Sequence, residues 1–99
     1  MQQTTTLQCE CVAEHRPSSV ENDVHHIHPL GEGGPDTPDN RVVRDPALHR
    51  GTHRILRFWK KVGRKPSQFE LKLLFNGQPV PRQALLDAIE GARRMGWKT

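Results

Sequence analysis

Residues 23–53 read DVHHIHPLGEGGPDTPDNRVVRDPALHRGTH and hold the strongest structural signals of the chain. Val24 and Ile27 are β-compatible, so residues 23–28 predict a short strand that Pro29 ends. The following residues, 31–40, are dense in Gly, Pro, Asp and Asn and predict a loop. Residues 41–44 (RVVR) predict a second short strand.

A helix is expected directly after the second strand. Asp45 is suited to cap it, with Pro46 at its first position. It would run to about Val62 and end at Gly63. Gly51 inside this helix weakens it by about 1 kcal/mol.

Residues 63–99 also read as helical. Ser67 and Glu70 have the spacing of a capping box ahead of a leucine-rich helix, which Asn76 and Gly77 would end. A last helix is expected over about residues 81–95, with Leu85, Ile89 and Ala92 on one face.

Length and composition favour one small domain. The chain has 99 residues, of which 33% are apolar and 5% aromatic. Such a core is thin, and a bound metal ion would add stability. No stretch approaches the roughly 20 apolar residues of a membrane span, and the N-terminus does not resemble a secretory signal. The expectation is a cytoplasmic protein that does not enter a membrane.

Charge is divided unevenly along the chain. Residues 1–40 carry a formal charge of −6, whereas residues 41–99 carry +10. A polyanionic partner explains this basic part, and nucleic acid fits better than anionic lipid because no strongly apolar amphipathic helix is evident. The alternative is a basic surface that is simply solvated.

The helix over residues 46–62 sorts its side chains by face. His49 and His53 are four residues apart, so they lie on one side and are spaced to hold one metal ion. The alternative is a chance pair on a solvated face. An apolar face borders the pair on one side and a basic stripe on the other; the apolar face is Ile55, Phe58, Trp59 and Val62, and the basic stripe is Arg50, Arg54, Arg57 and Lys61.

The adjacent His25 and His26 would point to opposite faces of their strand. One of them can therefore join His49 and His53 as a third ligand, while the other stays free. Three imidazoles leave open coordination positions, as in catalytic metal sites, and a free imidazole is a plausible general base. Together with the basic stripe, this predicts metal-assisted hydrolysis of a phosphodiester.

These residues resemble the motif of the HNH endonucleases. The resemblance covers about residues 9–57 and is closest to small HNH proteins of phages and actinobacterial genomes, whose phage genes often accompany the packaging terminase. It rests on His25-His26-Ile27-x-Pro29-Leu30, then Gly33-Gly34-Pro35-Asp36, then Asn40, then His49-x-x-x-His53. It implies an α+β, ββα-metal fold with a frayed N-terminus (1–8), a core (9–62) and a C-terminal helical extension (63–99).

The resemblance also implies roles. His25 and His49 would be metal ligands, and His53 the last ligand or a phosphate contact. His26 would be the general base, and Asn40 would brace the loop or assist at the metal. The implied reaction yields 5′-phosphate and 3′-hydroxyl ends with one divalent ion, which the sequence leaves open among Mg²⁺, Mn²⁺, Ni²⁺ and Zn²⁺. The implied partners are DNA and a terminase or other packaging protein, and the chain would be a monomer or weak dimer.

The chain departs from the family at its cysteines. Many members hold a structural zinc with two C-x-x-C pairs, but here only Cys9 and Cys11 are present, and Asp45 and Leu48 stand where the second pair would be. A structural zinc is therefore not expected. The alternative is a degenerate mixed site of Cys9, Cys11, His15 and Asp45.

Two questions stay open at the level of the sequence. The chain is either a DNA endonuclease, which nicks or cuts both strands, or an HNH-like DNA-binding or packaging accessory module without turnover. Residues 63–99 either complete the core or extend the DNA surface, and the first is favoured. For the same reason Trp59 and Trp97 are expected to be core anchors rather than stacking platforms, and His28 is expected to be exposed.

Overall fold

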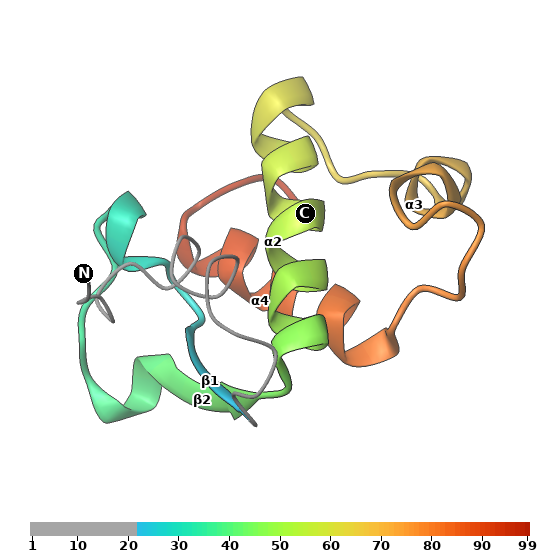
Figure 1. Ribbon diagram of the computed structural model, residues 1–99. Helices are drawn as coiled ribbons and strands as arrows, with labels where there is room; N and C mark the ends of the chain where they lie inside the picture. Colours follow the sequence, from blue (N-terminus) through green and yellow to red (C-terminus); the bar gives the residue numbers. More distant parts are fainter. Residues whose placement is uncertain (1–21) are drawn as a thin grey trace.

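Two antiparallel strands open the part of the chain that the structure describes, residues 22–99 of a computed structural model (Figure 1). Strand β1 (Asp23–His26) pairs with β2 (Arg41–Arg44), with Val24 opposite Val43. The second strand has its predicted bounds, whereas the first is two residues shorter than predicted. One further bond, from Ile27 N to Asn40 O at 2.9 Å, continues the pairing before Pro29 ends it.

The connection between the strands is more ordered than the predicted loop. It contains two 3₁₀ turns, η2 (Leu30–Glu32) and η3 (Pro38–Asn40). A Cβ atom at Gly34 would lie 1.8 Å from the carbonyl oxygen of His28, so only glycine fits there. This close approach folds the loop back on the end of β1.

Helix α2 (Pro46–Val62) has the predicted bounds. The Asp45 carboxylate caps it by accepting from the backbone N–H of Ala47 at 2.7 Å and of Leu48 at 3.3 Å. Gly63 ends it with a φ of 77°. Val62, predicted on the core-packing face, is 43% exposed, because the last turn of α2 extends beyond the other elements (Figure 1).

The C-terminal segment completes the core. Helix α3 (Gln68–Leu74) begins with the predicted capping box, and α4 (Arg82–Arg94) makes the largest interface with α2. The fully buried face of α4 is a row of small residues, and short side chains let two helices approach closely. Leu85 and Ile89, which were predicted on the buried face, are only partly buried. The buried core consists of Ile55, Leu56, Trp59, Leu71, Phe75, Ala84, Ala88 and Ala92.

The fold is therefore α+β, with a ββα arrangement formed by the hairpin and α2 and with additional C-terminal helices. An ion pair joins the hairpin to α4: Arg44 donates to the Asp87 carboxylate from Nε at 2.7 Å and from Nη2 at 3.1 Å. Asp87 is 6% exposed, so the pair is largely removed from water. No helix among residues 22–99 is long and apolar enough to span a membrane.

Two buried helical glycines are expected to respond oppositely to alanine. At Gly91, on α4, a Cβ would lie 2.6 Å from the backbone oxygen of Ile27, so we expect Gly91→Ala to destabilise the fold by about 1–3 kcal/mol. At Gly51, on α2, the nearest atoms would be at 3.4 Å, an ordinary contact, so Gly51→Ala should gain up to about 1 kcal/mol of helix propensity. Urea unfolding of both variants measures this. Equal stabilisation by both would show that α4 does not lie this close to the hairpin.

Candidate metal centre

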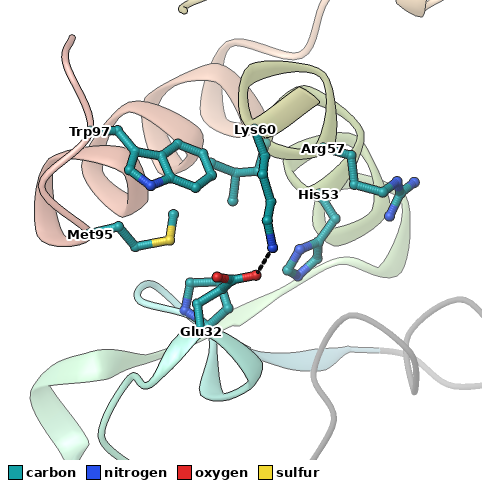
Figure 2. Close-up of a pocket in the computed structure, with 8 residues that line it drawn as sticks. Glu32, His53, Arg57, Lys60, Met95 and Trp97 are labelled. Carbon is teal, nitrogen blue, oxygen red and sulfur yellow. Dashed lines mark hydrogen bonds and ion pairs between the residues drawn. The ribbon is translucent and has the colours of Figure 1, made fainter. Parts of the chain in front are cut away.

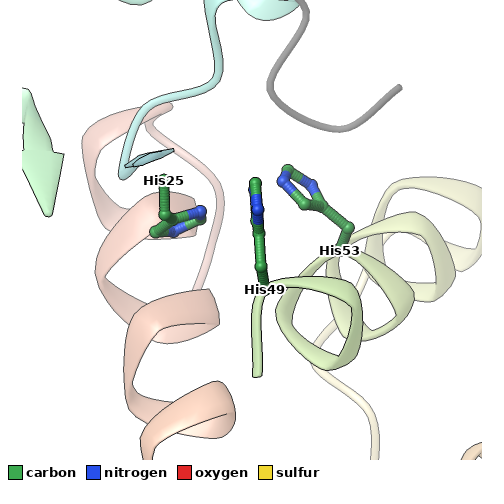
Figure 3. Close-up of side chains that lie close together, drawn as sticks. All are labelled: His25, His49 and His53. Carbon is green, nitrogen blue, oxygen red and sulfur yellow. The ribbon is translucent and has the colours of Figure 1, made fainter. Parts of the chain in front are cut away.

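Three histidine side chains from two elements converge at the centre of the ββα unit (Figure 3). His25 comes from β1, and His49 and His53 come from successive turns of α2. One ring nitrogen from each lies within 4.8 Å of the others. The ring centroids are separated by 5.0 Å for His25 and His49, 5.5 Å for His25 and His53, and 4.7 Å for His49 and His53. The structure thus brings together the three residues predicted as ligands.

The cluster is buried, and two of its three imidazoles, His25 and His53, are neutral at neutral pH. The exposed fractions of His25, His49 and His53 are 0%, 1% and 2%. Burial, with a smaller contribution from the neighbouring His49, lowers the pKa of His25 to about 4 and that of His53 to about 2. Neutral imidazoles keep a lone pair for a metal ion, so His25 and His53 are in their ligating form at neutral pH.

The ring nitrogens of His25 make the strongest argument for a metal ion. Both Nδ1 and Nε2 are buried and have no hydrogen-bond partner among the described residues. A buried polar atom left unsatisfied costs about 1–3 kcal/mol. A divalent ion held by His25, His49 and His53 would remove this cost at one of the two nitrogens, and its remaining coordination positions would stay open to water or substrate.

Asp23 orients one of the ligands. Its Oδ2 lies 3.2 Å from His49 Nδ1, and Asp23 is 2% exposed. A carboxylate oxygen at Nδ1 favours the tautomer with its proton there, so a neutral His49 would present Nε2 to a metal ion. This role of Asp23 was not predicted from the sequence, although the two-residue spacing of Asp23 and His25 places both on one face of β1.

His26 lies outside the cluster, as the alternation of side chains along the strand predicts. Its Nε2 lies 2.9 Å from Asp36 Oδ1 in the loop. This hydrogen bond lowers the pKa of Asp36, which is therefore ionised at neutral pH and accepts the Nε2 proton. In a neutral imidazole bonded in this way the lone pair would lie on Nδ1, the form required of a general base; this Nδ1 is buried and has no hydrogen-bond partner among residues 22–99. Asp36 had been noted only as part of the motif, and its contact depends on how the loop folds.

Asn40 braces the loop, the first of the two roles that the resemblance implies for it. Its Oδ1 accepts from His28 N at 2.8 Å, and its Nδ2 donates to the carbonyl oxygens of His28 at 2.9 Å and Pro35 at 2.7 Å. The side chain is fully buried and is not part of the histidine cluster. Asn40 is thus a positioning residue, which holds both ends of the segment that carries Asp36.

The four basic residues predicted to bind DNA are all exposed on α2, the helix that carries two of the cluster histidines. They are Arg50, Arg54, Arg57 and Lys61. Arg54 also stacks on the ring of Phe75, with its guanidinium carbon 5.3 Å from the ring centroid. Their contact with DNA remains a prediction.

The remaining predicted residues fall in three places. Cys9, Cys11 and the frayed segment 1–8 lie outside the described residues, as does His15. The Asp45 carboxylate is used as the cap of α2. His28, expected to be exposed, is half-buried, and its Nε2 lies 3.1 Å from the carbonyl oxygen of Glu32.

Comparison with known proteins adds no relative. No protein-family model matches the chain, and neither the curated proteins nor the solved structures contain a significant match. A functional interpretation therefore rests on the chemistry of the site and on the motif.

Proposed function

We propose that this chain is a metal-dependent DNA endonuclease of the HNH type. The observation that carries the proposal is the buried triad of His25, His49 and His53, in which the ring nitrogens of His25 have no other partner among the described residues. A three-imidazole site with open positions is typical of hydrolytic rather than structural metal centres. The adjacent His26 supplies a base, and α2 supplies cations for a phosphate backbone.

The roles of the residues follow from their contacts. A divalent ion bound by the triad would act as a Lewis acid on the phosphate and stabilise the leaving 3′ oxygen. His26 takes the proton of the attacking water, and Asp36 holds the imidazole in the form with its lone pair on Nδ1. Imidazole ligands carry no negative charge of their own. Even with the Asp23 carboxylate on His49, a divalent ion would therefore leave the centre positive toward an anionic substrate.

The products of this reaction carry a 5′ phosphate and a 3′ hydroxyl. All-imidazole ligands suit Zn²⁺ or Ni²⁺, whereas Mg²⁺ and Mn²⁺ are the ions more often used to cut DNA in cells.

We further propose that the chain works on phage or bacterial DNA in the cytoplasm, with a packaging terminase as its protein partner, because the motif most resembles that of small phage proteins.

Cleavage of supercoiled plasmid tests the proposal. We expect cleavage with at least one of Mg²⁺, Mn²⁺, Ni²⁺ and Zn²⁺ and none with EDTA. Open circles as product would indicate nicking, and linear molecules would indicate cleavage of both strands. DNA binding without cleavage under any of these ions, alone or with a terminase, would instead favour an HNH-like accessory module without turnover.

The basic stripe should contribute the salt-dependent part of DNA binding. We expect the double variant Arg50→Gln, Lys61→Gln to bind duplex DNA more weakly and to reduce the slope of log K against log salt by about 2, since each phosphate contact contributes about 0.9. Fluorescence anisotropy across a salt series measures this. The control is Lys72→Gln on α3, also an exposed cation. The control removes one charge and the double variant two, so half the change in the control would mean that only net charge matters.

A further inference from the structure

A pocket lies directly beside the histidine cluster and is not needed to hold a metal ion (Figure 2). Its volume is about 300 Å³, the lower end of the range of small-molecule sites. The loop after β1 contributes Pro29 and Glu32, and α2 contributes His53 and Leu56. His53 lines the pocket and also belongs to the cluster, so an occupant of the pocket would adjoin any group bound at the metal.

The pocket combines an aromatic and apolar wall with a cationic one. Met95 and Trp97 project into it from the segment after α4, and Arg57 and Lys60 border it from α2 (Figure 2). Lys60 donates to Glu32 at 2.5 Å, so that carboxylate is compensated by a cation at the same edge. A flat apolar ligand attached to an anion fits this combination, and a nucleobase on its phosphate backbone is such a ligand.

The backbone fixes the position of Trp97. Gly96 adopts a φ of 79°, and Trp97 N donates to the Ala92 carbonyl at 2.8 Å, which turns the chain back over α4. The Trp97 ring lies 6.3 Å from the ring of Trp59, which is 1% exposed. Trp97 is therefore half-buried against the core, as the sequence predicts for an anchor, and also lines the pocket. A side chain held in this way loses little conformational entropy when a base stacks on it.

From these observations we propose that the pocket is a subsite for one unstacked nucleobase of the DNA strand whose phosphate lies at the metal centre. The inference rests on the proposed nuclease function and adds a substrate class to it. A base inside a duplex must leave the stack to enter, which costs least where it is already unpaired. The preferred substrate is accordingly DNA with an unpaired or mismatched nucleotide next to the scissile phosphate.

The test compares three labelled duplexes by anisotropy, with EDTA present so that no cleavage occurs. One duplex is fully paired, one has a single mismatch, and one has an abasic nucleotide in place of the mismatched base. The mismatched and the abasic duplexes are similarly easy to deform, but only the mismatched duplex has a base that can enter the pocket. We expect the wild-type chain to bind the mismatch about 10-fold more tightly than the abasic duplex, in line with the stacking of one base on an aromatic ring.

Variants then locate the effect. Trp97→Ala should abolish the difference between mismatched and abasic DNA, and Trp97→Phe should keep most of it because a ring remains. If Trp97→Ala does not fold, Met95→Glu gives the same test by placing a negative charge in the pocket. Leu86→Ala, on an exposed part of α4 outside the pocket, should keep the full difference.

The outcomes separate the two hypotheses. Equal binding of mismatched and abasic DNA by the wild-type chain overturns the subsite while leaving the nuclease proposal intact, as does an undiminished difference in a folded Trp97→Ala or Met95→Glu variant. Failure to bind any of the three duplexes, both with EDTA and when the assay is repeated with Zn²⁺ or Mg²⁺, overturns the proposed function itself.

Discussion

Replacing His49 with alanine is expected to lower the affinity of the chain for a divalent metal ion by about 100-fold. Four-ligand structural zinc sites bind with about 10–16 kcal/mol, so one imidazole accounts for roughly 3 kcal/mol. The loss should be close to this value because His49 is central to the cluster, with its ring 5.0 Å from that of His25 and 4.7 Å from that of His53.

Calorimetric titration with Zn²⁺ and Ni²⁺ measures the affinity, and circular dichroism shows whether the variant is folded. His28→Ala is the matched control, because His28 lies in the same stretch, at a position that the motif leaves unspecified, and is not part of the cluster; it should bind metal as the wild type does. His49→Ala also removes one contact of the buried Asp23 carboxylate. His53→Ala therefore serves as a second variant, and wild-type affinity in both would show that the triad is not the metal site.

Metal should also stabilise the wild-type fold and not the His49→Ala variant. A ligand present at about 100 times its dissociation constant contributes about 2.7 kcal/mol to the free energy of unfolding. Thermal unfolding with the ion and then with EDTA gives this difference directly. A wild-type midpoint that is the same in both conditions would contradict a metal ion bound by the buried cluster.

The parts of the fold that depend on local spacing could be predicted from the sequence. Helix α2 was predicted with its bounds because a capping Asp45 and a terminating Gly63 act within one turn of the helix ends. The periods of a strand and a helix predicted that His49 and His53 would meet one of the two adjacent histidines of β1, and the resemblance to the HNH motif chose His25. These patterns need no knowledge of tertiary structure.

The supporting contacts could not be predicted in this way. Asp36 reaches His26 only because the loop folds back where Gly34 lies against the His28 carbonyl, and Arg44 meets Asp87 only because α4 docks on the hairpin. The docking itself depends on small side chains, whereas hydrophobicity favoured the larger Leu85 and Ile89 as core residues. Contacts between distant segments depend on how the elements pack, and a periodic sequence pattern does not predict that packing.

Replacing His26 with alanine is expected to reduce DNA cleavage by at least about 100-fold, the usual contribution of a general base. Metal binding should not change, because His26 is not part of the triad, and DNA affinity should not change, because the basic stripe lies on α2. Plasmid cleavage, calorimetry and anisotropy on the same preparation separate these effects. Wild-type cleavage by His26→Ala would show that the attacking water loses its proton to another group.

Asp36→Asn tests whether His26 needs the Asp36 carboxylate to act as the general base. The amide can donate to the ring as well as accept from it, so it no longer fixes which nitrogen of His26 carries the proton. We expect kcat to fall by less than in His26→Ala, with KM and metal affinity unchanged. Asp39→Asn is the control, since Asp39 is exposed in the same loop and its carboxylate accepts from the Thr37 hydroxyl at 2.6 Å rather than from a histidine. If Asp36→Asn and Asp39→Asn lower kcat equally, loop charge rather than the His26 contact is responsible, because only Asp36 touches the imidazole.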